Sequence, residues 1–144
     1  MFDFSKIKKN YHRTKILVVD DETNITQVLK DRLEMNGYTV FTAANGREGL
    51  DTAVNVQPEI ILLDIMMPVM DGLEMLEALR QRPEGKDISV IMVSAKDGMQ
   101  DIARAEACGV EDYIVKPFEL TALIGKIENI VERRRASIEG RLPK

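Results

Sequence analysis

The chain has 144 residues, of which 44% are hydrophobic and 31% are charged, and its formal net charge is −4. This length suits one globular domain with a real core, and the negative charge argues against nucleic-acid binding by the chain alone. No apolar run approaches the roughly 18 residues of a membrane span, and the first residues lack the apolar segment of a secretory signal. The single cysteine, Cys108, cannot form an internal disulfide, so we expect a reducing, cytoplasmic location.

Two short basic segments lie near the ends of the chain. Residues 1–15 contain five basic side chains and one acid, and Arg133-Arg134-Arg135 forms a second cluster. Two interpretations stay open: solvated flanks, which short charge runs usually are, and surfaces that contact an acidic partner.

The first third of the chain predicts strands and helices in alternation. Lys15–Asp20 is a β-branched run that predicts a strand and ends in an acid. Residues 24–36 predict a helix that Gly37 ends. Its inward face has four apolar side chains: Ile25, Val28, Leu29 and Leu33. Thr39–Ala43 predicts a second strand, and Gly46–Asn55 predicts a second helix.

The alternation continues to the end of the chain. The remaining predicted elements are a strand over Glu59–Asp64, a helix around residues 73–79, a strand over Ser89–Ser94, a helix over Met99–Ala107, a strand over Asp112–Val115 and a helix from Glu119 to about Arg135. In the last helix, Leu120 to Val131 supply the inward side chains, whereas residues 132–135 are all charged. We therefore expect this helix to run past its core-facing part into a linker.

The order of elements is a strand followed by a helix, five times. Short strands joined through helices pair in parallel, because only a crossover returns the chain to the same starting edge. The first, third and fourth strands are apolar on both faces, as a sheet covered by helices on both sides requires. We predict an α/β fold: a flavodoxin-like, doubly wound five-stranded parallel sheet in 2-1-3-4-5 order.

Polar side chains stand at the carboxyl end of each strand near the point where this strand order reverses. Asp20 and Asp21 follow the first strand, Asp64 ends the third, Ser94 ends the fourth and Lys116 follows the fifth. Ligands of open parallel sheets bind at this place. Two like charges about 4 Å apart cost about 4 kcal/mol at an effective dielectric of 20, so three carboxylates there favour a bound cation. Oxygen ligands of this kind suit Mg²⁺.

Other readings of these residues stay open at this point. Asp20 and Asp21 could cap the following helix, and Asp64 could be a nucleophile, a metal ligand or a cap. Ser94 could be a helix N-cap and Lys116 a surface lysine. Tyr113, in the predicted strand Asp112–Val115, could be an ordinary edge-strand aromatic. The chain has no G-x-x-x-x-G-K-[ST], G-x-G-x-x-G or G-x-S-x-G motif, which argues against P-loop, dinucleotide and serine-hydrolase sites.

Four separated motifs make the chain resemble the receiver domain of bacterial response regulators over residues 15–133. They are Ile16–Glu22 with its acidic pair, Ile60–Gly72 with the acceptor aspartate, Ile91–Ala95 with the hydroxyl residue, and Gly109–Phe118 with the aromatic residue and the lysine. Each motif alone is weak, but their common order and spacing are specific.

This resemblance implies a role for each site residue. Asp64 would take the phosphoryl group, while Asp20 or Asp21, Asp64 and the backbone carbonyl of Met66 would hold Mg²⁺. Lys116 would contact the phosphoryl group, and its peptide bond to Pro117 is typically cis in the family. Ser94 would move toward the phosphoryl group and Tyr113 would swing inward.

The resemblance also implies a function, a phosphorylation-dependent switch in a two-component phosphorelay. The donor would be a histidine kinase or a histidine phosphotransfer protein, and the output would pass through a changed surface made by the fourth helix, fifth strand and fifth helix. A phosphorylation-dependent homodimer and a downstream output domain or protein are further expected partners. The domain would perform only its own phosphotransfer and dephosphorylation, and would not act as an enzyme on other substrates.

Two alternatives belong to other classes of protein. A haloacid-dehalogenase-like phosphatase also uses an aspartate nucleophile and Mg²⁺, but it needs a second aspartate where this chain has Met66. A phosphate-independent pseudo-receiver would act as an interaction module, but such domains typically lose the acidic pair, the acceptor or the lysine.

The resemblance sets the expected boundaries of the domain. Residues 1–14 form a basic N-terminal extension, 15–133 the receiver domain and 134–144 a C-terminal tail or linker. Ile138-Glu139-Gly140-Arg141 has the form of a protease-recognition sequence, so part of this tail can be an added tag. A stand-alone protein and a receiver cut from a longer regulator both fit the sequence.

Overall fold

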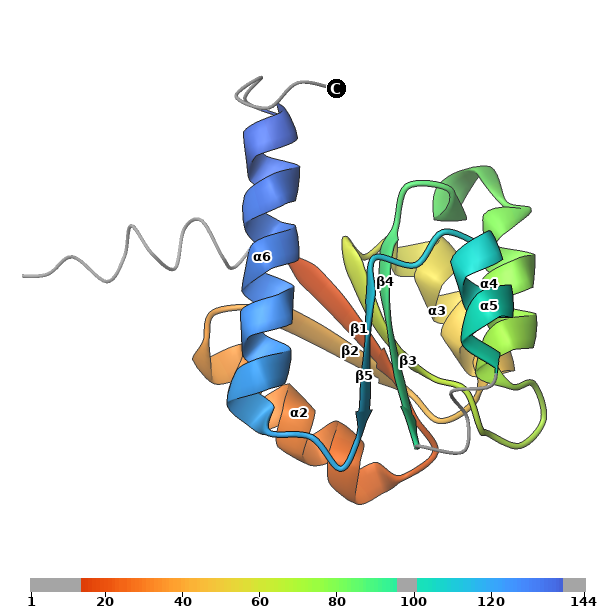
Figure 1. Cartoon of the computed structure of the whole chain (residues 1–144), viewed down its shortest axis with the longest axis horizontal. Helices are drawn as coiled ribbons and strands as arrows, with labels where there is room; N and C mark the ends of the chain where they lie inside the picture. Colours follow the sequence, from red (N-terminus) through yellow and green to blue (C-terminus); the bar gives the residue numbers. More distant parts are fainter. Residues whose placement is uncertain (1–13, 96–100, 139–144) are drawn as a thin grey trace, which may run out of the picture.

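The computed structural model describes residues 14–95 and 101–138, in which strands and helices alternate (Figure 1). The elements are β1 (Lys15–Val19), α2 (Thr23–Met35), β2 (Thr39–Ala43), α3 (Gly46–Val56), β3 (Ile60–Asp64), α4 (Gly72–Arg80), the 3-10 helix η1 (Pro83–Gly85), β4 (Ser89–Ala95), α5 (Ile102–Ala107), β5 (Asp112–Lys116) and α6 (Leu120–Ile138). No helix in these two ranges is long and apolar enough to cross a membrane.

The five strands form one parallel sheet in the order β2-β1-β3-β4-β5. The register places Val19 beside Leu63, Asp64 beside Val93 and Ala95 beside Lys116. The carboxyl ends of β1, β3, β4 and β5 therefore lie along one edge of the sheet. The predicted fold class and strand order are confirmed.

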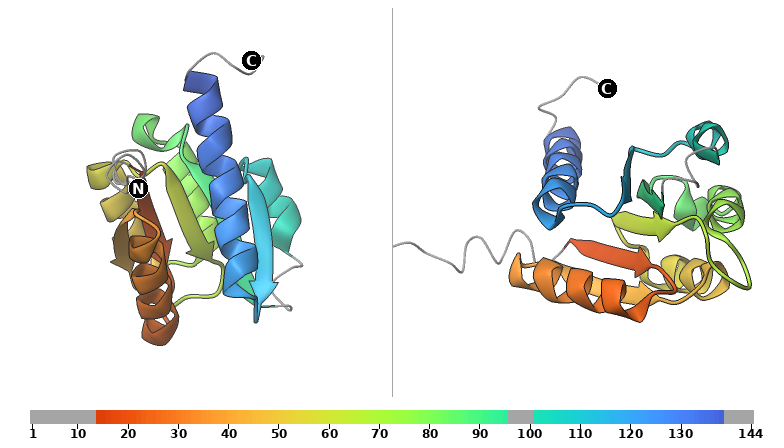
Figure 2. Two further views of the ribbon diagram at one scale, coloured as in Figure 1. Left: turned by 90° about the vertical axis from the view of Figure 1, so that its left-hand side faces the viewer. Right: turned by 60° about the horizontal axis from the view of Figure 1, so that its bottom comes forward.

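Two helical layers cover the sheet, with α2 and α6 on one side and α3, α4 and α5 on the other (Figures 1 and 2). Alternate residues of each strand face opposite layers: Leu17 and Leu63 pack with α3 and α4, whereas Ile16 and Leu62 pack with α2 and α6. The side chains of both faces are apolar because both faces are covered. Two hydrophobic cores, one on each side, thus hold the sheet in place.

The first predicted helix is confirmed, but the prediction that all four of its apolar side chains face the core is wrong for Val28. Gly37 has a φ of 95°, the left-handed conformation that glycine adopts readily after a helix. Val28, expected to be buried, is 56% exposed. Thr26 is buried in its place, since the stripe of α2 that faces the sheet runs through Thr26, Leu29 and Leu33. The reason is a small rotation of the helix about its axis, which hydrophobic periodicity alone does not determine.

The last helix stays attached to the domain beyond the point where its apolar pattern ends. α6 continues to Ile138, and Ala136 is buried. The guanidinium of Arg134 donates to the Asp87 carbonyl and the Ser89 hydroxyl, both at 2.9 Å. Arg133 forms an ion pair with Glu111 at 3.4 Å. Charged side chains near the end of α6 therefore contact the segments that precede β4 and β5, whereas the linker expected beyond residue 133 stays a prediction.

Most of the N-terminal basic segment, the end of the predicted C-terminal tail and the start of one predicted helix lie outside the described residues. Residues 1–13 and 139–144 are not described, and neither is Met99, the predicted start of the helix that is described as α5 from Ile102.

Candidate functional site

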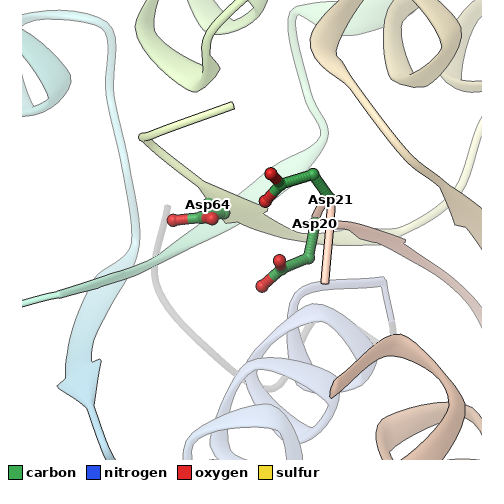
Figure 3. A group of neighbouring side chains, drawn as sticks. All are labelled: Asp20, Asp21 and Asp64. Carbon is green, nitrogen blue, oxygen red and sulfur yellow. The ribbon is translucent and has the colours of Figure 1, made fainter. Parts of the chain in front are cut away.

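Three carboxylates meet at the reversal point of the strand order. Asp20 and Asp21 directly follow β1, and Asp64 is the last residue of the neighbouring strand β3 (Figure 3). One carboxylate oxygen of each lies within 4.8 Å of those of the other two. Asp20 and Asp64 are each only 4% exposed, whereas Asp21 is exposed. The geometry thus unites the three acids that the sequence analysis selected, with two of them buried and one open to solvent.

Lys116 lies against this acidic group. Its ammonium is 2.7 Å from Asp20, 3.3 Å from Asp64 and 3.4 Å from Glu22, and its side chain is 13% exposed. The Lys116-Pro117 peptide bond is cis, as the resemblance implied. Interpreting Lys116 as an ordinary surface lysine is therefore wrong, since its charge is directed at the buried acids. Glu22, which the sequence analysis did not select for the site, is a third contact of this lysine.

The pKa values of the two central groups reflect this arrangement. Burial, followed by the charge of Asp20, raises the pKa of Asp64 from 3.8 to about 6, although Lys116 and the backbone amide of Met66 act in the opposite direction. Burial alone would lower the pKa of Lys116. The hydrogen bond to Asp20 and the charges of Asp64, Asp20 and Glu22 outweigh it and raise that pKa. A carboxylate that is hard to ionise is thereby held beside a firmly charged ammonium.

Asp20 does not act as the cap of the following helix. The N-cap of α2 is Glu22, and it makes no side-chain capping bond. One oxygen of Asp20 accepts the Glu22 backbone N–H at 2.9 Å, and the other accepts from Lys116. The turn after β1 therefore orients Asp20 into the site, and the capping interpretation of the acidic pair is wrong.

The loop that follows Asp64 returns closely to the end of β3. The Gly72 N–H donates to the Ile65 carbonyl at 2.9 Å, and a Cβ at Gly72 would collide with the Asp64 carbonyl. Asp71 begins α4 with a capping box: its side chain accepts from Glu74 N, and the Glu74 side chain accepts from Asp71 N. The loop is consequently anchored at both ends, with Met66 as its second residue.

Ser94 and Tyr113 lie on adjacent strands beyond the acidic group. Ser94 is buried within β4, and its hydroxyl donates to the Ala95 carbonyl at 3.2 Å. The N-cap of α5 is Asp101, so the interpretation of Ser94 as a helix N-cap is wrong. Tyr113, on β5, is 42% exposed and thus stands in an outward orientation. Among the described residues, neither side chain hydrogen-bonds to Asp64.

An apolar groove of about 620 Å³ opens beside the site. Its apolar lining comes from α2, β4 and the β5–α6 connection: Ile25, Val28, Leu29, Ala95, Pro117, Phe118 and Leu120. Lys116 and Glu22 line its end nearest the acids. The exposed Val28 that departs from the predicted core is therefore part of a surface next to Asp64. No feature of the sequence indicated this groove, because Val28 falls on the predicted apolar face of its helix.

The fold and the position of the acidic site together define a signalling domain of the two-component kind. The family described as the response regulator receiver domain matches residues 16–128, and the chain belongs to this family.

Individual relatives agree with this assignment. The transcriptional regulatory protein PrrA of Mycobacterium leprae is 37% identical over 123 residues, which cover 85% of this chain and 52% of PrrA. The response regulator MprA of Mycolicibacterium vanbaalenii is 36% identical over 119 residues, which cover 83% of this chain and 51% of MprA. The chain thus spans about half the length of these curated relatives.

Solved structures show the same fold. The chemotaxis protein CheY4 of Vibrio cholerae has a TM-score of 0.76 and 32% identity, with 81% of this chain and 98% of CheY4 covered. A CheY-like receiver domain protein of Methanospirillum hungatei has a TM-score of 0.79 and 32% identity, with 86% of this chain and 98% of that protein covered.

Proposed function

We propose that Asp64 is the phosphoryl acceptor of this receiver domain and that Mg²⁺ is its cofactor. The observation that supports the proposal best is the placement of Asp64 at a strand end, within reach of two other carboxylates and of Lys116. No other described group of three or more acidic, histidine or cysteine side chains has a comparable arrangement. The chemistry requires little more than positioning and charge neutralisation.

The donor is a phosphohistidine of a histidine kinase or of a histidine phosphotransfer protein. An oxygen of Asp64 attacks the phosphorus, the P–N bond to the imidazole breaks, and an acyl phosphate forms on Asp64. Asp20, Asp21, Asp64 and the Met66 carbonyl would hold Mg²⁺, which would neutralise charge on the phosphoryl oxygens when bound. The oxygen-only donor set fits this hard cation, and two of its carboxylates are already buried.

Lys116 has two tasks in this proposal. In the unphosphorylated protein it offsets the repulsion between Asp20 and Asp64. After transfer, its ammonium can pair with a phosphoryl oxygen, because it already lies 3.3 Å from the acceptor carboxylate. Ser94 then donates its hydroxyl to another of these oxygens, and Tyr113 turns from its exposed position into the space beside β4.

The partners follow from the surfaces around the site. The donor protein covers the apolar groove, since Lys116 lines one end of it and the donor imidazole must reach Asp64. The signal leaves through the surface of α5, β5 and α6, either to an output domain, to another protein or to a second copy of this chain. The domain performs its own phosphotransfer and dephosphorylation only, in the cytoplasm, where a chain with one free cysteine meets a reducing environment.

The two alternatives have less support. A phosphatase of the haloacid-dehalogenase type lacks its second aspartate here, and the family assignment does not favour it. A pseudo-receiver would not need Asp20, Asp64 and Lys116 in mutual contact, as they are.

Incubation with acetyl phosphate and Mg²⁺ tests the proposal. Intact-mass spectrometry should show one phosphoryl adduct in the wild-type chain and none in Asp64→Asn. Asp71→Asn is the matched control, since Asp71 is an acid of the same loop that caps α4, and it should still be labelled. Labelling that persists in Asp64→Asn would show that the acceptor is another residue.

A further inference from the structure

The first turn of α3 is joined to the loop between β3 and α4. The Gly46 N–H donates to the Met70 carbonyl at 2.9 Å. A Cβ at Gly46 would lie 2.5 Å from that oxygen and 2.9 Å from the Asp71 carbonyl, far inside van der Waals contact. Gly46 has no positive φ, so alanine is excluded here by this close approach and not by the backbone conformation. The absence of a side chain thus lets two backbones meet.

The loop has an unfavourable backbone conformation at the residue before this contact. Val69 has a φ of 71°, and the Met70 N–H donates to the Pro68 carbonyl at 2.9 Å. A β-branched residue in this region of the backbone map is strained. Such strain persists only where surrounding contacts over-determine the conformation. The hydrogen bond from Gly46 to Met70 is one such contact, and it comes from a helix 24 residues earlier in the chain.

The opposite end of the same loop touches the acceptor. The backbone of Met66 lies next to the Asp64 carboxylate, whose pKa it lowers. The Gly72 N–H ties the loop to Ile65, the residue next to Asp64. The six residues from Ile65 to Met70 are therefore anchored beside Asp64 at one end and at Gly46 at the other.

We propose that Gly46 is a positioning residue for the acceptor site. The N-terminus of α3 holds the loop in its strained conformation, and the loop in turn orients the Asp64 carboxylate and the Met66 backbone for Mg²⁺ and for the phosphoryl group. This inference rests on the proposed function of Asp64. Gly46 touches none of the reacting groups itself.

Gly49 provides a matched control on the same helix. A Cβ there would meet the Met75 sulfur at 2.9 Å and the Val19 methyl groups at 3.0 Å. These are side chains of the hydrophobic core, and none belongs to the loop between β3 and α4. Gly49→Ala therefore strains the packing of α3 without pushing on the loop.

The test compares Gly46→Ala and Gly49→Ala in three measurements. Urea unfolding gives stability, calorimetric titration gives Mg²⁺ affinity, and amide NMR reports the chemical shift and hydrogen exchange of the Met66 N–H. We expect both variants to lose stability, but only Gly46→Ala to weaken Mg²⁺ binding about fivefold or more and to alter the Met66 signal. Replacing the Gly46 amide by an ester removes the donor and adds no atom, so it gives the same comparison if Gly46→Ala does not fold.

A Gly46→Ala or ester variant that keeps the wild-type Mg²⁺ affinity and Met66 signal would overturn the inference. Phosphoryl uptake from acetyl phosphate is measured in parallel. If the wild-type chain took up no phosphoryl group, the proposed function would fail, yet the Met66 signal would still decide whether Gly46 positions the loop. The two failures are therefore distinguishable.

Discussion

Asp64 is subject to opposing influences that its neighbours set. Burial and the charge of Asp20 disfavour its ionised form, whereas Lys116 and the Met66 amide favour it. The result is a carboxyl that is neutral in mild acid and charged near pH 7. One lysine only partly offsets the repulsion between the acids of this site. The repulsion between these acids therefore lowers the stability of the metal-free protein, and a bound cation would relieve it.

Removing the exposed member of the acidic group should separate metal binding from folding. We expect Asp21→Ala to weaken Mg²⁺ binding about tenfold or more, because one carboxylate ligand is lost, while metal-free stability rises as repulsion falls. Calorimetric titration and thermal unfolding in EDTA measure the two effects. Asp51→Ala removes an exposed acid from α3 and should leave Mg²⁺ affinity unchanged. Equal affinities in Asp21→Ala and the wild-type chain would exclude Asp21 as a ligand.

The raised pKa of Asp64 predicts a pH dependence of metal-free stability. Between pH 3.8 and about 6 the unfolded chain releases the proton of Asp64 while the folded chain retains it. The stabilisation from this group is fully present below pH 3.8 and is lost as the pH rises through about 6. At about 1.4 kcal/mol per pKa unit, the loss is on the order of 1–3 kcal/mol.

Asp64→Asn isolates this effect because asparagine does not titrate. Urea unfolding in EDTA at several pH values should show the wild-type chain losing stability relative to the variant from pH 4 to pH 6. A constant difference, or one that grows in favour of the wild-type chain, would contradict the raised pKa.

Among the elements, the amino ends of β4 and β5 depend on one arginine that the sequence analysis did not select. Arg80, the last residue of α4, donates to the carbonyls of Gly85 at 2.6 Å, Ile88 at 2.9 Å, Cys108 at 2.8 Å and Gly109 at 2.8 Å. The planar guanidinium is thereby shared between the segment before β4 and the turn after α5. These contacts fix the turn that leads into β5, the strand that carries Tyr113. This turn lies at the amino end of the strands, and the acidic group lies at their carboxyl end.

Replacing Arg80 should be costly for folding but not for the chemistry of the site. Arg80→Ala leaves three partly buried carbonyls without this donor, so we expect a loss of about 2–4 kcal/mol in the free energy of unfolding. Arg80→Lys should recover little of this loss, because an ammonium cannot reproduce the fork of the guanidinium. Arg47→Ala, at an exposed position of α3, should change stability by at most about 0.5 kcal/mol. Urea unfolding followed by circular dichroism measures all three, and a fully stable Arg80→Lys would contradict the role of the fork.

In the molecule as a whole, the acidic site lies at the ends of β1 and β3, whereas the surface of α5, β5 and α6 includes the edge strand of the same sheet. Tyr113 is exposed on β5, and Arg104 of α5 forms an ion pair with Glu77 at 2.9 Å in which both side chains are at least half exposed. A switch between inactive and active conformations that moves their populations from 1:99 to 99:1 needs about 5.5 kcal/mol of differential stabilisation. One hydrogen bond to a charged group provides only about 1.5–3 kcal/mol, so a contact formed in the active state must supply the rest.

We expect that contact to be a symmetric dimer through the surface of α5, β5 and α6. Sedimentation with a beryllofluoride phosphate mimic should show a mass that rises with concentration, and the rise should disappear in Tyr113→Ala and in Arg104→Glu. Met35→Ala removes an 84% exposed side chain from α2, a helix that is not part of this surface, and should dimerise like the wild-type chain. A monomer at high concentration with and without the mimic would leave docking to a different protein as the output.

The fold and the meeting of the acidic group with Lys116 at one edge of the sheet were predictable from local features of the sequence. The alternation of β-branched runs with 3.6-residue periodicity identified every strand and the helices between them, because these periods are properties of neighbouring residues. Parallel pairing then placed Asp20, Asp21, Asp64 and Lys116 at one edge, since the carboxyl ends of parallel strands coincide. The acidic group at this edge and the family resemblance therefore both follow from the sequence alone.

Contacts between segments distant in the sequence were decided only by the tertiary structure. The rotation of α2 that exposes Val28, the attachment of α6 through Arg134 and the approach of Gly46 to Met70 leave no periodic signal. Each depends on how closely two elements pack, and close packing is set by the sum of many side-chain volumes in the core. Sequence pattern thus determined which charged residues meet at one edge of the sheet, whereas packing decided where α3 contacts the loop that follows Asp64.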